Sequence, residues 1–348
     1  MTQTSTGDST ILPQSNNSES TPRPQVSVVV PMFNEAENLR PLVAQLIPVL
    51  ERCAESFEIV FVDDGSHDGT VDILRALHAA DSRISAVSFS RNFGKEVAIA
   101  AGLDHAQGDA IVIMDADLQH PPELIVSFVK LWKEGYQNVY GIRTDREGYS
   151  PLRRVLTEKF YDLFAMFGEI RLPPGAGDFR LLDKKAVSAL RAMGERARFS
   201  KGLYAWVGFR SIGVPFESSE RAFGHSKFSY GSLTRFALDG LMSFTVVPLR
   251  MWTFIGMFVS VVSLVLAAYY LIRTAAYGVD VPGYASLIVS ILFFAGIQIF
   301  SLGVLGEYVG RIFAEVKRRP LYLVAERIGT EVDDDTPLPT RVANRTLQ

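Results

Sequence analysis

Short apolar runs alternate with segments of helical period between residue 25 and about residue 142. The runs occupy residues 26–30, 57–62, 84–89, 110–114 and 138–142. Fully apolar runs of this length, joined by helices, are typical of a mostly parallel sheet that is covered on both faces. We therefore predict an α/β domain over residues 25–229.

Polar clusters directly follow four of these apolar runs. They read Pro31-Met32-Phe33-Asn34-Glu35, Asp63-Asp64-Gly65-Ser66, Arg91-Asn92-Phe93-Gly94-Lys95 and Asp115-Ala116-Asp117. Ligands of parallel sheets bind beyond the carboxyl ends of the strands, where such clusters meet. The pattern therefore predicts one binding site that four strand ends share.

The C-terminal third contains two long stretches without a charged residue, 22 positions over residues 251–272 and 23 positions over residues 284–306. At about 1.5 Å rise per residue, a helix of either length spans the roughly 30 Å hydrocarbon core of a bilayer. Two buried helices of a soluble domain are the alternative, but uncharged runs of this length are rare in soluble folds. We predict two transmembrane helices within residues 251–309.

Basic residues flank the two apolar stretches and are scarce between them. Lys227, Arg235 and Arg250 precede the first stretch, and Arg311, Lys317, Arg318 and Arg319 follow the second. The positive-inside rule then places the α/β domain and both termini in the cytoplasm, in a multi-pass protein of the inner (cytoplasmic) membrane. Residues 230–250 mix apolar residues with Arg235 and Asp239, which predicts an amphipathic segment in the membrane interface.

The two ends of the chain are polar. Residues 1–24 are rich in Ser, Thr, Asn and Pro and lack the apolar core of a signal peptide, so we expect a disordered cytosolic tail. Residues 310–348 read as a basic and then acidic cytoplasmic tail. The net charge of −3 indicates no nucleic-acid partner, and the single Cys53 fits a reducing compartment.

The pair Asp115 and Asp117 is the strongest chemical signal, because it comes directly after an apolar run. Two carboxylates at a strand end are suited to hold a hard divalent cation, which can neutralise a diphosphate. Loop or helix-capping roles are the alternative for so short a motif, and a helix-capping turn is also open for Asp63 or Asp64. No Gly-x-Gly-x-x-Gly follows the first run, which weakens a dinucleotide-binding dehydrogenase.

Longer motifs around these residues resemble those of the family 2 glycosyltransferases. They are the runs 28–35, 62–66, 68–70 and 114–123. Within the family they are similar to the polyprenyl-phosphate branch, which includes dolichol-phosphate mannose synthase and the bactoprenol glucosyltransferases. The runs 305–311 and 315–320 resemble the two-span bacterial bactoprenol-linked members, so the resemblance covers roughly residues 25–325.

This resemblance implies a GT-A fold, a divalent cation (Mg or Mn), a nucleoside-diphosphate sugar donor and a polyprenyl phosphate acceptor. For the donor it implies a nucleotide pocket of Pro31, Phe33 and Glu35, with base and ribose contacts from Val62 and Asp64. It implies a metal and diphosphate site of Asp115, Ala116, Asp117 and Gln119. Of these, Asp115, Asp117 and Gln119 are the expected metal ligands. Lys95, which follows the third apolar run, is expected to contact the base or a phosphate.

The resemblance also assigns roles to basic residues. Arg221 and Lys227 would stabilise the leaving diphosphate, and Arg143 would bind the acceptor phosphate, helped by Arg153, Arg154 and Lys159 on the following helix. A solvated charged face is the alternative for the last three. From its own place in a Gly-rich turn, and not from the resemblance, Asp178 is expected to position the acceptor or sugar, or to serve as a catalytic base. A buried cap or turn is the alternative for Asp178.

The reaction expected from these parts is a single in-line displacement that inverts the anomeric centre. UDP-glucose and undecaprenyl phosphate are the first choice of substrates. GDP-mannose, UDP-N-acetylglucosamine, an amino-arabinose donor and a non-catalytic membrane scaffold are the alternatives. No Gln-x-x-Arg-Trp motif is present, which favours one sugar per event. Small residues and Gln298 in the second stretch favour helix contacts and hence a homo-oligomer.

Overall fold

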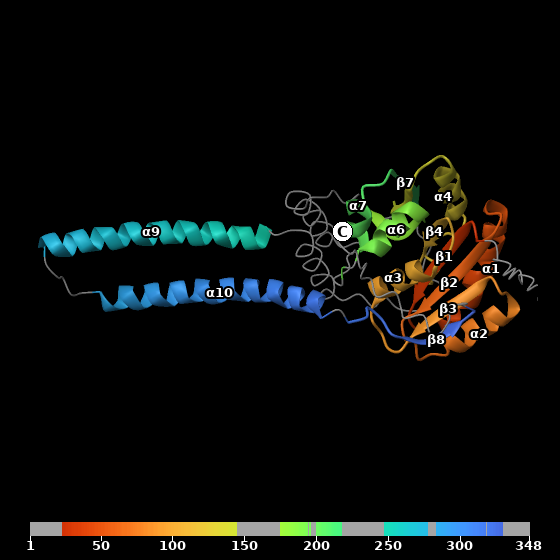
Figure 1. Ribbon diagram of the computed structural model, residues 1–348, viewed down its shortest axis with the longest axis horizontal. Coiled ribbons are helices and arrows are strands. Elements are labelled where there is room, and N and C mark those ends of the chain that lie inside the picture. Colours follow the sequence, from red (N-terminus) through yellow and green to blue (C-terminus); the bar gives the residue numbers. More distant parts are fainter. Residues whose placement is uncertain are drawn as a thin grey trace, which may run out of the picture.

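The computed structural model describes residues 23–144, 175–193, 195, 200–217, 247–277, 283–317 and 319–329. These residues form an α/β domain from which two long helices extend to one side (Figure 1). The predicted α/β class is therefore confirmed, and the structure also has a helical hairpin at the C-terminal side of the chain.

The strands and helices have the following bounds. The strands are β1 Val26–Met32, β2 Phe57–Asp63, β3 Ile84–Phe89, β4 Ala110–Ile113, β5 Asn138–Arg143, β6 Ala176–Asp183, β7 Ser211–Phe216 and β8 Val324–Ile328. The helices are α1 Ala36–Cys53, α2 Thr70–Ala80, α3 Lys95–His105, α4 Leu124–Lys133, α6 Lys184–Ala192, α7 Ser200–Trp206, α9 Val247–Tyr277 and α10 Tyr284–Val316. The five predicted apolar runs thus form β1 to β5.

All eight strands belong to one sheet, in the order β7-β5-β6-β4-β1-β2-β3-β8. The central strands β4, β1, β2 and β3 run parallel to one another, as the apolar runs predicted. Three strands were not predicted: β6 and β8 pair antiparallel with their neighbours, and β7 pairs parallel with β5. Because β6 inserts between β4 and β5, the fifth run does not lie beside the fourth.

Helices cover both faces of the sheet, and the alternation of strand side chains sorts the two cores. Val28 and Val30 of β1 pack in the cluster that includes residues of α1, α2 and α4. Val29 points the other way and packs against α3, α6 and α7. Strands buried on both faces must be apolar throughout, which explains why these runs lack the polar-apolar alternation of a half-exposed strand.

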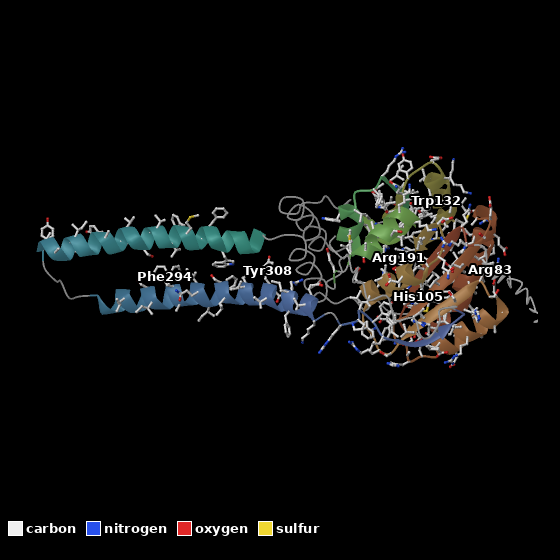
Figure 2. The ribbon with its side chains drawn as sticks, in the orientation of Figure 1. Arg83, His105, Trp132, Arg191, Phe294 and Tyr308 are labelled. Carbon is white, nitrogen blue, oxygen red and sulfur yellow. The ribbon has the colours of Figure 1, made fainter. Side chains whose placement is uncertain are left out.

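Helix α3 is held closely against both the sheet and α6. A Cβ on Gly102 would lie 2.1 Å from Cγ1 of Val29, so only glycine allows this approach of α3 to β1. At the other side, Arg191 of α6 donates hydrogen bonds to the carbonyl oxygens of Leu103 and Ala106, close to His105 (Figure 2). The first residue of α3, Lys95, is thereby set on a rigid support.

The chain returns from the hairpin to the edge of the sheet. Beyond α10, β8 pairs antiparallel with β3, and the amide of Ser90 donates to the carbonyl oxygen of Leu323 at 2.9 Å. Tyr322 is 6% exposed and its ring stacks on Phe89 at 4.9 Å between centroids. Residues that we expected to be only tail therefore complete the α/β domain.

The two helices of the hairpin lie side by side (Figure 1) and expose apolar side chains. Within the described residues, the segment Phe293–Val316 is long and apolar enough to cross a membrane, and none of its most apolar window is buried. Large exposed apolar surfaces mark contact with a membrane or another protein. The hairpin therefore indicates membrane association.

Candidate active site

The carboxyl ends of β1, β2, β3 and β4 meet at one edge of the sheet, where the predicted site residues lie. Strand β6 contributes from the opposite direction. Ile113 of β4 pairs with Arg180 of β6 in an antiparallel register. Two residues further along β4 and two residues back along β6, Asp115 and Asp178 therefore come together.

The turn after β4 has an uncommon backbone that a neighbouring histidine holds. Leu118 has φ 59°, a left-handed conformation that is uncommon for leucine and that is found most often at functional sites. The amide of Asp115 donates to Nδ1 of His120 at 3.1 Å, and the amide of Gln119 donates to Oδ1 of Asp117 at 3.2 Å. Asp117 is 6% exposed, whereas the Asp115 side chain is 27% exposed.

His120, which directly follows the predicted metal motif, belongs to the site although no role was predicted for it. Its ring stacks on Phe179 at 4.7 Å, and burial lowers its pKa, with Asp115 acting in the opposite direction. With Nδ1 accepting from Asp115, the neutral ring carries its proton on Nε2. The histidine thus fixes the backbone at the first aspartate of the pair.

Lys95 joins the two strand ends. Its Nζ lies 2.6 Å from Oδ1 and 2.8 Å from Oδ2 of Asp115, and 3.2 Å from Oδ2 of Asp178. Burial alone would lower the pKa of Lys95, but Asp115 and Asp178 outweigh it and raise the pKa above its usual range. The lysine is therefore a fixed positive charge between two carboxylates.

Asp178 is the most buried carboxylate next to Lys95. Burial acts to raise its pKa, but Lys95, Lys201 and Arg180 outweigh burial and hold the pKa below its usual range. Its Oδ1 is buried and has no hydrogen-bond partner among the described residues. A buried ionised oxygen without a donor is costly, so this atom is a candidate acceptor for a ligand group.

A buried polar group behind Asp178 was also missed. Arg180 of β6 is 3% exposed and its guanidinium lies 3.7 Å from the ring centroid of Tyr204 on α7. Glu96 of α3 accepts hydrogen bonds from the backbone and the hydroxyl of Ser200. The available signal was Arg180 itself, a charged residue inside the otherwise apolar run Phe179-Arg180-Leu181-Leu182.

Both carboxylates of the earlier pair, Asp63 and Asp64, accept hydrogen bonds from other groups of the protein. Asp63 accepts from the amide of Ser66 at 3.0 Å and from the hydroxyl of Ser88 at 2.6 Å. Asp64, 3% exposed, accepts from the amides of Phe93 at 2.6 Å and Gly94 at 2.9 Å. Neither side chain caps α2, whose N-cap is Gly69: Asp63 holds the turn that follows β2, and Asp64 anchors the loop that leads into Lys95.

The remaining predicted residues divide into those at this edge and those outside the described residues. Pro31 and Val62 are buried register partners at the ends of β1 and β2, followed by Phe33 and Glu35, and Ala116 is 3% exposed in the turn. Arg143 ends β5, which runs parallel to β4 two strands away. Arg153, Arg154, Lys159, Arg221 and Lys227 lie outside the described residues, as does most of the expected interfacial segment.

The donor set at this edge fits a cation that arrives with its substrate. Among the described residues, no group of three or more His, Cys, Asp or Glu side chains is placed to hold a metal ion. Magnesium is commonly held by one or two carboxylates, with substrate phosphates and waters completing the octahedron. The carboxylates of Asp115 and Asp117, with the side-chain carbonyl oxygen of Gln119, supply such a partial set.

Comparison with known proteins matches two parts of the chain. The model described as glycosyl transferase family 2 matches residues 27–191, and the model described as GtrB C-terminal hairpin matches residues 247–312. The uncharacterized glycosyltransferase sll0501 of Synechocystis sp. is 48% identical over 307 residues, which is 88% of this chain and 96% of that protein. The SfII prophage-derived bactoprenol glucosyl transferase of Shigella flexneri is 42% identical over 308 residues, covering 86% and 97%.

A solved structure also matches, at greater distance. The mannosyltransferase PcManGT of Pyrobaculum calidifontis, in complex with GDP-Man and Mn2+, is 20% identical with a TM-score of 0.44, over 86% of this chain and 87% of that one.

Proposed function

The chain belongs to glycosyl transferase family 2, and from that premise we propose that it transfers one sugar from a nucleoside-diphosphate sugar to a polyprenyl phosphate. UDP-glucose and undecaprenyl phosphate are the first choice of donor and acceptor, because several relatives at 42% identity bear the name bactoprenol glucosyl transferase. The product is a polyprenyl-phosphate-sugar that serves glycan modification. The mostly parallel sheet is what a GT-A fold requires.

One observation carries the proposal. Carboxylates from two neighbouring strands, Asp115 and Asp178, converge on a single ammonium group at the edge of the sheet where ligands bind. A site that holds a positive charge between two carboxylates is suited to a ligand that brings its own cation and negative charge. A nucleoside diphosphate with a divalent cation is such a ligand.

The donor would be bound across the ends of β1, β2 and β4. Pro31, Phe33, Glu35, Val62 and Asp64 form the expected nucleotide side. Asp64 has two backbone donors, but a carboxylate offers about four lone-pair sites, so a ribose hydroxyl or base N–H still has an acceptor there. Asp115, Asp117 and Gln119 would hold Mg or Mn, which supplies Lewis-acid stabilisation of the diphosphate when bound.

The residues then act on the two phosphate groups separately. Arg221 and Lys227 donate to the leaving diphosphate, while Arg143, with Arg153 and Arg154, holds the acceptor phosphate. An oxygen of that phosphate attacks the anomeric carbon as its bond to the diphosphate breaks on the opposite face. The anomeric centre is inverted, and the electron pair of the broken bond stays on the nucleoside diphosphate.

Asp178 acts by position in this scheme. A phosphate monoester has a second pKa of about 6 and is largely dianionic at pH 7, so its oxygen needs no base to ionise it. A carboxylate whose pKa lies below its usual range is also a weak proton acceptor. We propose that Oδ1 of Asp178, which has no partner among the described residues, accepts a hydrogen bond from a hydroxyl of the sugar and so orients the sugar ring.

The membrane hairpin brings the acceptor to this edge. We propose that α9 and α10 cross the inner membrane, with the α/β domain and both termini cytoplasmic, and that residues 230–250 lie in the interface. The return of β8 to the sheet ties the end of α10 to the same domain. A homo-oligomer formed through the small residues of α10 belongs to this proposal.

The test uses full-length protein in detergent with undecaprenyl phosphate, Mg and radiolabelled UDP-glucose, GDP-mannose, UDP-N-acetylglucosamine or an amino-arabinose donor. We expect transfer of one sugar to lipid, which a chelator and Asp117→Ala abolish. Asp109→Ala is the matched control, because Asp109 pairs with Lys184 at 2.9 Å at the opposite edge of β4. Nucleotide binding without transfer from any donor would contradict the proposal and favour a non-catalytic scaffold.

A further inference from the structure

Lys95 uses both oxygens of the aspartate that is expected to receive the metal. Its Nζ lies 2.6 Å and 2.8 Å from the two oxygens of Asp115. The same group lies 3.2 Å from Asp178. A lysine ammonium has three donor hydrogens, so these three oxygens account for its full donor capacity.

The position of this ammonium is built into the fold. Lys95 is the first residue of α3 and follows Gly94, which has φ 101°, a conformation that favours glycine. The amides of Phe93 and Gly94 are held by Asp64, which is itself buried at the end of β2. Behind the lysine, Ala98 and Ile99 of α3 are buried against the sheet. Such a lysine has little freedom of backbone position.

A divalent cation and the Lys95 ammonium compete for Asp115. Each carboxylate oxygen keeps a further lone-pair site, but two cations a few ångströms apart repel each other strongly in a partly buried site, so the ammonium weakens cation binding there. The lysine remains reachable, since its side chain is 42% exposed. A diphosphate that enters with its cation therefore offers the ammonium a new anionic partner at the moment when Asp115 is taken.

We propose that Lys95 is an internal counter-ion that holds the cation site closed until the nucleoside diphosphate arrives. On arrival, the ammonium leaves Asp115, keeps Asp178 and donates to a diphosphate oxygen, and Asp115 turns to the cation. This inference rests on the proposed function, because it takes Asp115 as a metal ligand.

The test measures Mn2+ binding directly, by the electron paramagnetic resonance signal of free Mn2+, with full-length protein in detergent. Wild-type protein should bind Mn2+ weakly alone and tightly with UDP. Lys95→Met should bind Mn2+ without UDP at least about tenfold more tightly than wild type, the size of effect that one adjacent charge has on a neighbouring equilibrium. Added UDP should improve Mn2+ binding by Lys95→Met far less than it improves binding by wild type.

Two further variants make the result specific. Lys95→Arg keeps the competing charge and should bind Mn2+ alone as weakly as wild type. Lys184→Met removes a lysine from another Lys-Asp pair, Lys184 with Asp109, and should also leave Mn2+ binding unchanged. Lys95→Gln serves in the same way as Lys95→Met if the methionine variant does not fold.

The outcomes separate this inference from the proposed function. If wild type binds Mn2+ with UDP, but neither neutral variant gains affinity for Mn2+ alone, the counter-ion role is wrong and the proposed function stands. A loss of UDP affinity with no gain for Mn2+ would make Lys95 a plain phosphate ligand and overturns the inference equally. If wild type fails to bind Mn2+ even with UDP, the proposed metal site is wrong and the inference fails with it.

Discussion

Replacing Tyr322 by alanine should loosen the loop that carries Lys95, although the two residues are far apart in the sequence. Tyr322 comes from the segment that returns from α10, and its ring stacks on Phe89 at the end of β3 with 20° between the ring planes. Phe89 contacts Phe93 edge-on at 5.7 Å. The amide of Phe93 is one of the two that Asp64 holds. The contact therefore connects the hairpin side of the chain to the active-site loop.

The size of the effect follows from burial. Tyr322 is 6% exposed, so nearly the whole ring is removed from water. Truncating a buried aromatic side chain to alanine costs about 3–5 kcal/mol, in which the stacking contributes about 0.5–1.5 kcal/mol. If the loss is felt by the whole domain, the midpoint of thermal unfolding falls by roughly 6–20 °C. If the segment merely detaches, opening of β8 becomes about a hundredfold to a few thousandfold more frequent, since 1.4 kcal/mol is a factor of ten.

Hydrogen exchange measured by mass spectrometry separates these outcomes and reaches the loop directly. We expect faster exchange at the Ser90 amide, which donates to Leu323, and in the peptide covering residues 90–95. Leu323→Ala is the matched control: its side chain is 51% exposed and its carbonyl is retained, so the change should stay within about 0.5 kcal/mol. Unchanged exchange over residues 84–95 in Tyr322→Ala would refute the connection between the returning segment and the loop.

Two further predictions concern α3, which carries Lys95. Gly102→Ala should lower the free energy of unfolding by about 1–3 kcal/mol despite the better helix propensity of alanine, because the added Cβ would lie 2.1 Å from Cγ1 of Val29. Denaturant titration measures this change, and a gain in stability would contradict the close packing of α3 on β1. Burial, Arg327 and Arg191 lower the pKa of His105, which lies near Arg191 (Figure 2), whereas Asp104 acts in the opposite direction. Among the described residues, the buried Nε2 of His105 has no hydrogen-bond partner. Because the folded pKa of His105 lies below the unfolded value of about 6.5, the stability that the neutral histidine contributes is fully present above about pH 6.5 and is lost as the pH falls. The thermal midpoint of His105→Gln should therefore drop less between about pH 7.5 and about pH 5.5 than that of wild type.

The strands that could be predicted from sequence are those buried on both faces. The runs that became β1 to β4 are predominantly apolar, and that pattern has one common explanation in a parallel sheet. The edge strands are different: β7 is partly exposed along its whole length, and β8 contains Glu326, which pairs with Arg75 on α2. Their place depends on partners more than 70 residues away in the chain, and no local pattern encodes such a partner.

The insertion of β6 had a larger consequence for the site. Asp178 was singled out as a lone carboxylate in a Gly-rich turn, and its closeness to Asp115 could not be inferred from a separation of more than 60 residues. The antiparallel register of β6 on β4 creates that closeness. The carboxyl ends of the parallel strands could be predicted to meet, because a parallel sheet places them at the same side. Strand β6 runs in the opposite direction, so its first residues, and not its last, lie beside the carboxyl end of β4.

The two aspartate pairs show why motif chemistry needs the surrounding backbone. Asp63-Asp64 and Asp115-Ala116-Asp117 both follow apolar strands, and both were given the same competing interpretations. In the first pair, both carboxylates accept hydrogen bonds from amides or a hydroxyl of the protein and hold the loops that follow β2 and β3. Asp115 instead accepts from the side chain of Lys95, which can change partner, whereas a backbone amide is fixed in place. The folded loops decide which donors a carboxylate already has, so the difference between the two pairs cannot be read from the motifs.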